Sequence, residues 1–214
     1  MADTYAEREL TPDDIVAASD VCRQAMAPHV DDDWSVTAGS LEWDCRRTLD
    51  HIADALCFYA GSAASRAKVR IASVRGGNAN ASVAQLVEAI GTAANILTVV
   101  TREMPPDARG FHPAGMADAT GFVGMACTET LVHSYDISQG LGFDLQPSGE
   151  LCASVLRRLF PWVTELGDPW QTLLWTTGRI TLPDRVGVEP DWYWQCAPLA
   201  EWDGTVRRRA KPPA

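Results

Sequence analysis

Four long stretches of this chain repeat apolar side chains every three to four residues, and this feature limits its fold more than any other. The stretches lie at residues 12–27, 44–65, 82–102 and 116–139. This spacing places apolar side chains on one face of a helix, which must then be buried against another element. Because four such helices with short connections can bury these faces together, the sequence predicts an all-α fold built on an antiparallel four-helix bundle.

Residues at the ends of these stretches favour the start or the end of a helix. Thr11 and Ser82 can cap the first and third helices, because hydroxyl oxygens at this position accept hydrogen bonds from free backbone N–H groups. Pro12 suits a first helical turn, where its missing N–H leaves nothing unpaired. The glycine-containing run at 140–142 should end the fourth helix.

The remainder of the chain carries weaker helical signals. Shorter helices are expected at 148–160 and 168–178, and the segment 67–81 could hold either a short strand or a loop. We therefore expect one structural domain in two parts. Residues 1–145 would form a metal-binding four-helix bundle, and residues 146–214 a C-terminal helical extension with an irregular tail packed on it.

The charge of the chain argues against nucleic acid as a partner. Its 28 acidic and 18 basic residues give a formal net charge of −10, which repels phosphate backbones. The basic run of Arg207, Arg208, Arg209 and Lys211 is expected to be a solvated tail. The polar start of the chain does not resemble a signal segment, and no stretch is expected to be apolar enough to span a membrane. The sequence thus favours a cytoplasmic protein without a membrane partner.

The cysteines give no sign of a metal or redox motif of their own. There are six of them, at positions 22, 45, 57, 127, 152 and 196, and none forms a C-x-x-C pair. All are expected to be small buried residues in a reducing compartment.

Glu129 and His133 form the first candidate for chemistry. They are four residues apart in a helical stretch, so both side chains lie on one face about one turn apart. This spacing alone is common, and a hydrogen-bonded pair would explain it equally well. His51 is a third ionisable group in an apolar helical stretch. Since burying unpaired polar groups is costly, one shared metal ion would explain all three residues together.

Several sequence motifs around these residues resemble a known family. The chain is similar to the DinB-like superfamily, in its actinobacterial branch of mycothiol-dependent maleylpyruvate isomerase-like proteins, over residues 15–185. The resemblance rests on Leu-Glu-Trp-Asp at 41–44, Thr-Leu-Asp-His-Ile-Ala at 48–53, Phe-His-Pro-Ala-Gly at 111–115, Glu-Thr-Leu-Val-His-Ser-Tyr-Asp at 129–136 and Leu-Trp-Thr-Thr-Gly-Arg at 174–179.

The resemblance implies a metal enzyme that uses a thiol. His51, Glu129 and His133 would correspond to the family's metal ligands, with zinc as the first choice and nickel or iron as alternatives. Two imidazoles and one carboxylate would leave a coordination position for water or a thiol. Mycothiol would be the cosubstrate, and its thiolate would attack a small electrophilic substrate in an S-transfer or isomerisation reaction.

Other residues are candidates for supporting roles. Asp54 and Asp136 could each orient a ligand imidazole, and His112 could be a general acid or a substrate contact. Tyr59 and Trp43 could line the pocket, although core packing would explain them too.

Three arginines, Arg46, Arg47 and Arg179, are candidates for binding a substrate carboxylate.

Two other functions remain open from the sequence. One is a hydrolase or lyase that uses metal-bound water, with His112 as its base. The other is a non-enzymatic, metal-stabilised binding module. The tryptophan-rich C-terminus also suggests a buried interface, as in a homodimer.

Overall fold

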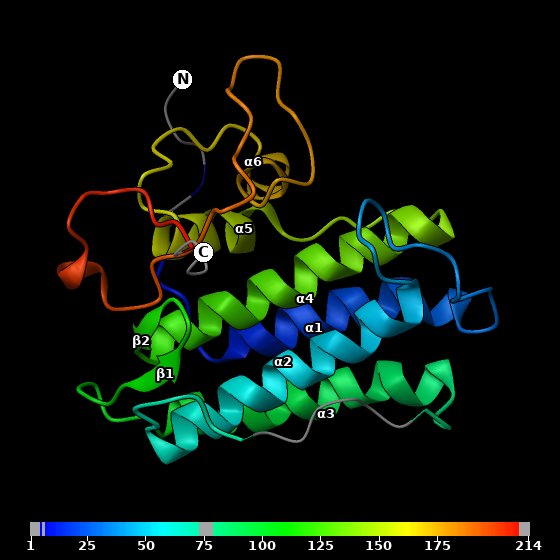
Figure 1. Ribbon diagram of the computed structural model, residues 1–214, viewed down its shortest axis with the longest axis horizontal. Helices are drawn as coiled ribbons and strands as arrows, with labels where there is room; N and C mark the ends of the chain where they lie inside the picture. The colour runs from blue at the N-terminus through cyan, green and yellow to red at the C-terminus, as the bar shows by residue number, and fades with distance from the viewer. Residues whose placement is uncertain (1–4, 6, 73–78, 210–214) are drawn as a thin grey trace, which may run out of the picture.

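A computed structural model describes residues 5, 7–72 and 79–209 of the chain, and most of the described residues are helical (Figure 1). The mostly helical character agrees with the predicted all-α class. The α-helices are α1 (Asp13–Met26), α2 (Cys45–Ser65), α3 (Val83–Arg102), α4 (Ala119–Leu141), α5 (Gly149–Leu159) and α6 (Pro169–Thr176), and short 3-10 turns cover Ala27–His29 and Leu199–Glu201.

Side-chain caps fix the starts of α2, α3 and α4, and of the two predicted caps, Thr11 and Ser82, only Ser82 is confirmed. Asp44 caps α2 by accepting a hydrogen bond from the backbone N–H of Arg47. Ser82 caps α3 in a reciprocal capping box with Gln85. The prediction was wrong for Thr11, whose side chain does not cap α1; its backbone N–H instead donates to the carboxylate of Asp14.

A small hairpin precedes α4 and was not predicted. Strands β1 (Gly110–His112) and β2 (Gly115–Ala117) pair antiparallel, with Gly110 opposite Ala117 and His112 opposite Gly115. The predicted start of the fourth helix at residue 116 was therefore too early. The helix begins only after Asp118, whose carboxylate caps it at the N–H of Gly121.

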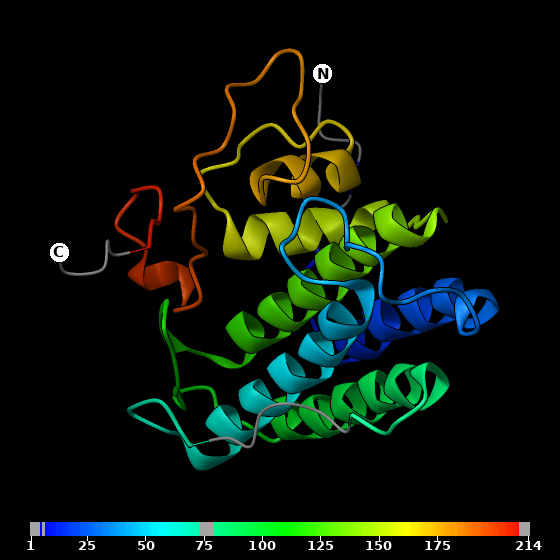
Figure 2. The same ribbon diagram turned by 45° about the vertical axis from the view of Figure 1, so that its right-hand side comes forward.

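Helices α1 to α4 lie side by side and share one core (Figures 1 and 2). Helix α2 contacts α3 and α4, and α1 contacts α3 and α4 as well. Helix α4 also contacts α5, so it is buried on nearly every side, and Phe122, Leu131 and Ile137 are fully buried along it. Glycine at position 142, with φ +77°, ends α4 in the left-handed conformation that favours this residue.

Helix α3 corrects one expectation from the sequence. Its length of 20 residues and mean hydropathy of 1.6 would by themselves allow it to cross a membrane. The reason is its composition, in which Glu88 and Arg102 are the only charged side chains. In the structure 44% of this apolar window is buried, and the helix packs on α1 and α2. Length and hydropathy alone are therefore weak evidence that α3 crosses a membrane, because a core helix can have the same length and hydropathy.

The C-terminal segment is irregular and is attached to α4 and α5 by polar contacts. Arg158 of α5 donates to the backbone carbonyls of Gln195, Cys196 and Ala197 at 2.8, 3.2 and 3.2 Å. Gly121 of α4 leaves the space for this segment, since a Cβ atom there would overlap the carbonyl oxygen of Cys196. Residues 192–209 thereby lie against the N-terminal end of α4, as Figure 2 shows in orange and red.

Two further expectations are only partly met. Residues 67–72 form no strand, and the rest of the proposed strand or loop at 67–81 lies partly outside the described residues. Five cysteines are buried as expected, but Cys57 is exposed, because it lies on the outer side of α2. All six cysteines are free thiols.

Candidate metal centre

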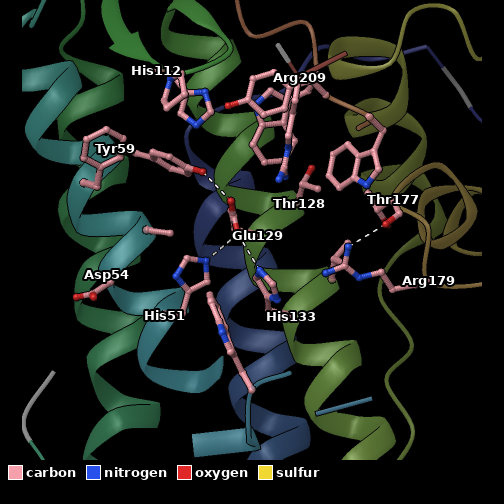
Figure 3. A pocket seen from close by; sticks show the side chains of 18 of the residues that line it. His51, Asp54, Tyr59, His112, Thr128, Glu129, His133, Thr177, Arg179 and Arg209 are labelled. Carbon is pink, nitrogen blue, oxygen red and sulfur yellow. Dashed lines mark hydrogen bonds and ion pairs between the residues drawn. The ribbon is translucent and has the colours of Figure 1, made fainter. Parts of the chain in front are cut away.

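The three proposed ligands come together between α2 and α4 (Figure 3). His51 extends from α2, and Glu129 and His133 extend from adjacent turns of α4. Glu129 Oε2 lies 3.7 Å from His51 Nε2 and 3.2 Å from His133 Nε2. The two imidazole rings meet edge to face, with their centroids 5.0 Å apart. The sequence therefore predicted correctly which residues meet, although it could not show that one carboxylate oxygen faces both histidines.

The geometry of this cluster fits a divalent cation. One donor atom from each residue can be chosen so that all three lie within 4.8 Å of one another. Zinc bonds of about 2.0–2.1 Å would place tetrahedral ligands roughly 3.3 Å apart, so small side-chain movements would close the site. Among the described residues this is the only such group of three. Neither Cys45 nor Cys127 belongs to it; their thiols contact the backbone carbonyls of Ile137 and Asp14.

Tyr59 of α2 holds the other oxygen of the same carboxylate. Its phenol donates a hydrogen bond of 2.9 Å to Glu129 Oε1, which leaves Oε2 to the two histidines. Burial raises the pKa of Tyr59 well above its usual value, and the nearby charge of Glu129 adds to this effect. The phenol therefore stays protonated and remains a donor. The sequence pointed to Tyr59 only as a lining or core residue; an aromatic ring with a polar tip in a helix is too common a signal to show this contact.

Asp136 contacts the imidazole nitrogen of His133 that faces away from Glu129, as predicted. Its Oδ2 lies 3.0 Å from His133 Nδ1, and it also binds the guanidinium of Arg179 at 2.9 Å. Such a carboxylate contact fixes which imidazole nitrogen faces a metal. Asp54 lines the neighbouring cavity, and its proposed contact with His51 stays a prediction.

Glu129 and His133 each shift the pKa of the other. Burial alone would raise the pKa of Glu129, but hydrogen bonds and charges from His133 and His51 outweigh it and hold this pKa well below its usual value. Burial alone would lower the pKa of His133, but hydrogen bonds to Asp136 and Glu129 raise it to about 9. Without a metal, then, the protonated His133 and the guanidinium of Arg179 together offset the charges of Glu129 and Asp136. A divalent cation would take the place of the proton on His133.

The cluster faces a cavity of about 410 Å³ that has two different walls. Helices α2 and α4 provide one wall, and the hairpin and the C-terminal segment provide the other. Its lining residues are Trp43, His51, Asp54, Ala55, Phe58, Tyr59, Arg70, His112, Pro113, Thr128, Glu129, Val132, His133, Thr177, Arg179, Trp192, Tyr193, Trp194 and Arg209. This volume is within the usual range for small-molecule sites.

His112 lies in the hairpin and borders this cavity. Its side chain is packed among the rings of Tyr59, Tyr193 and Trp194. Burial lowers the pKa of His112 to about 4, with a further decrease from Arg70 and Arg209. Its Nδ1 accepts a hydrogen bond of 3.0 Å from the N–H of Ala114, so the proton of the neutral ring is on Nε2. The structure thus gives a neutral donor at this position rather than a cationic acid.

The three arginines proposed as carboxylate binders have other partners. Arg179 lines the cavity, but its guanidinium is bound to Asp136. Arg46 donates to the carbonyl of Ala81, and Arg47 stacks over the ring of Trp43 at 4.5 Å. Sequence could not separate these arginines from the other cations of the chain, because partner choice depends on tertiary contacts.

The expectation of a solvated basic tail is met in part, since Arg208 and Arg209 are exposed and Arg207 is half-buried, but each of them also contacts other residues of the chain. Arg207 binds the side chain of Gln195 at 2.7 Å, and Arg208 pairs with Asp191. Arg209 lines the cavity and lies over the ring of Tyr193. The acidic and aromatic residues at 191–195 hold these cations in place. Lys211 lies outside the described residues.

The fold and the site together define a mostly helical protein with a two-histidine, one-glutamate cluster open to a cavity. No family model, curated protein or solved structure matches this chain.

Proposed function

We propose that this protein is a metal-dependent enzyme in which a low-molecular-weight thiol, mycothiol or a close equivalent, attacks a small electrophilic substrate. In this proposal the chain is a cytoplasmic, DinB-like four-helix bundle, and the reaction is an S-transfer or an isomerisation. The observation that carries it is the cluster of His51, Glu129 and His133, which has three donors and one side open to a cavity of about 410 Å³.

The donor set supports a zinc-type site. Two imidazoles and a carboxylate are typical ligands of catalytic zinc, which keeps a further position open; nickel and iron accept the same donors. A divalent cation held there would lower the pKa of a bound thiol and keep it as a thiolate at neutral pH. Tyr59 and Asp136 would fix the orientation of Glu129 and His133, because each binds the ligand atom that faces away from the cluster centre.

The residues around the cavity support an electrophile with a carbonyl group. In a conjugate addition, the thiol sulfur bonds to one carbon of a carbon–carbon double bond conjugated to the carbonyl, the electron pair of that double bond shifts onto the carbonyl oxygen as an enolate, and the thiol proton passes to solvent. The Nε2–H of His112 can donate to that oxygen as its charge grows. In an isomerisation, rotation about the weakened carbon–carbon bond and reversal of the addition regenerate the thiol. In a transfer, the adduct takes up a proton and leaves.

His112 favours the thiol reaction over the hydrolase or lyase that uses metal-bound water. A hydrolase would need a base, and His112 is the candidate on the cavity wall. Its Nδ1 already accepts from Ala114, so its Nε2 carries a proton and donates instead. The neutral imidazole therefore suits the binding of a substrate oxygen better than the removal of a proton from water. A metal-stabilised binding module remains the outcome if no reaction is found.

Metal content tests the proposal first. The untagged full chain should contain about one equivalent of zinc, nickel or iron by elemental analysis. The His51→Ala/His133→Ala variant should lose the metal, whereas a His29→Ala control should keep it, since His29 pairs with Asp32 away from the cluster. Mycothiol should then raise the melting temperature of the metal-loaded protein and not that of the double variant. Failure of the wild-type protein to bind or be stabilised by added zinc would reject the proposal.

A further inference from the structure

Two arginines beside the cavity differ from Arg179 in their partners among the described residues. Arg70 and Arg209 both line the cavity, and neither forms an ion pair with a carboxylate of the described residues. Arg179, on the same cavity, is by contrast bound to Asp136 at 2.9 Å. The side chains of Arg70 and Arg209 are both exposed, and their guanidinium groups leave a positive charge on their side of the cavity, whereas its acidic lining residues are Asp54 and Glu129.

Aromatic rings hold these two guanidinium groups in place. The Cζ atom of Arg70 lies 5.0 Å from the ring centre of Phe58, and that of Arg209 lies 5.3 Å from the ring centre of Tyr193. Stacking of this kind restricts the side chain but leaves the N–H groups at its edge free to donate. Arg70 and Arg209 can therefore present paired donors that no other described residue occupies.

The two arginines act on the same part of the cavity. Arg70 covers the ring of Phe58 and Arg209 that of Tyr193, and these two rings lie 6.5 and 6.0 Å from the ring of His112, centre to centre. Figure 3 shows His112 and Arg209 at one end of the cavity, with His51 and His133 at the other end and Glu129 between them. The cavity thus has a cluster of metal ligands at one end and a cationic end with a neutral histidine donor at the other.

We propose that Arg70 and Arg209 form an anion subsite for the carboxylate of the electrophilic substrate. A guanidinium edge matches a carboxylate with two parallel hydrogen bonds, and Nε2–H of His112 supplies a further donor nearby. The substrate would be a small carboxylic acid whose electrophilic carbon extends from this subsite toward His51 and His133. The assignment of the substrate rests on the proposed function, but the subsite itself can be tested without any reaction.

Calorimetric titration of the metal-loaded full chain tests this subsite. The probes are succinate, its uncharged diamide and inorganic phosphate. Arg70→Gln and Arg209→Gln should each weaken succinate binding by about tenfold, the size expected for loss of one charge-assisted contact. The diamide should not bind, and added salt should weaken succinate binding. Arg185→Gln is the matched control, because Arg185 also stacks on an aromatic ring, that of Trp175, but does not line this cavity. This variant should bind succinate like the wild type.

The alternatives give separate results. Unchanged succinate affinity in the Arg70→Gln/Arg209→Gln variant, no binding of succinate to the wild type, or tighter binding of phosphate than of succinate would each overturn the carboxylate subsite. Succinate binding that is lost only in His51→Ala/His133→Ala would also overturn it, since the probe would then bind the metal. Arginine-dependent succinate binding in a chain that takes up no metal would support the subsite while rejecting the proposed function.

Discussion

The two walls of the cavity are built in different ways. On the helical wall, His51, Glu129 and His133 lie on two regular helices, and their positions follow from helical spacing and from caps at Asp44 and Asp118. The opposite wall consists of the hairpin and of residues 192–209, which we call the C-terminal wall. Residues 192–209 are almost without regular structure. They are held by contacts between distant parts of the chain, such as the N–H of Gln195 donating to the carbonyl of Leu159 at 2.8 Å.

This difference separates two properties of the site. Local structure places the groups that would hold a metal, whereas tertiary contacts place the arginine and aromatic groups that would select a substrate. The helical wall should therefore survive damage to the C-terminal wall, but the reverse need not hold. The following changes test that separation, starting with the one of largest expected effect.

Replacing Arg158 should detach the C-terminal wall. Arg158 is 8% exposed and pairs with Asp118 while donating to three backbone carbonyls. Arg158→Met leaves these acceptors unpaired, which should reduce the free energy of unfolding by roughly 3 kcal/mol. Urea titration measures this loss, and limited proteolysis should show earlier cleavage within 192–209. The neighbouring Arg157→Met is the control and should cost less. Loss of metal binding together with the wall would contradict the separation.

His112 lies on the hairpin and packs against Tyr59 of the helical wall, and its burial predicts a dependence of stability on pH. Its pKa falls from 6.5 to about 4 on folding, so the unfolded chain binds more protons between these values. The contribution to stability is complete above pH 6.5 and is lost as the pH falls toward 4, up to about 3 kcal/mol in total. We expect His112→Gln to flatten the acid side of the stability curve of the metal-free protein, measured by urea titration at several pH values. If the free energy of unfolding changed by the same amount at every pH, with no change in its slope against pH, the link to His112 would be disproved.

The smallest effect is expected on the helical wall. Tyr59→Phe removes the hydrogen bond to Glu129 Oε1 but keeps the ring, so the carboxylate loses one of the contacts that orient it. Zinc affinity should fall about tenfold, as for other outer contacts of metal ligands, with little loss of stability. Competition titration with a chelator measures the affinity. Tyr193→Phe is the matched control on the other wall and should leave zinc affinity unchanged.

The sequence predicted the helical wall well, because its signals are local. Spacing alone placed Glu129 and His133 on one face, apolar periodicity placed the start of α2 within one residue, and the predicted cap Ser82 marked the start of α3. The start of α4 was less accurate, since the hairpin at Gly110–Ala117 depends on its pairing and not on a run of strand-forming residues.

The C-terminal wall was hardly predictable. Arg209 looked like part of a solvated tail, and the tryptophans suggested an interface with another copy. In the structure Trp192 and Trp194 pack on each other and around the cavity of their own chain, with ring centres 5.6 Å apart. Nothing local marks the contacts of these rings with the cavity, because they join residues far apart in sequence, such as Trp194 and His112. A homodimer therefore stays a prediction, without the support that these rings appeared to give it.

Glycine at position 121 has a consequence for the recognition of related chains. Any side chain there would occupy the path of the backbone at Cys196, so a bundle with a larger residue at the third position of α4 must send its C-terminus elsewhere. Gly121 together with Arg158 is therefore a two-residue signature of closure. In newly sequenced chains with the same three candidate ligands, it would identify those whose C-terminus completes the cavity in this way.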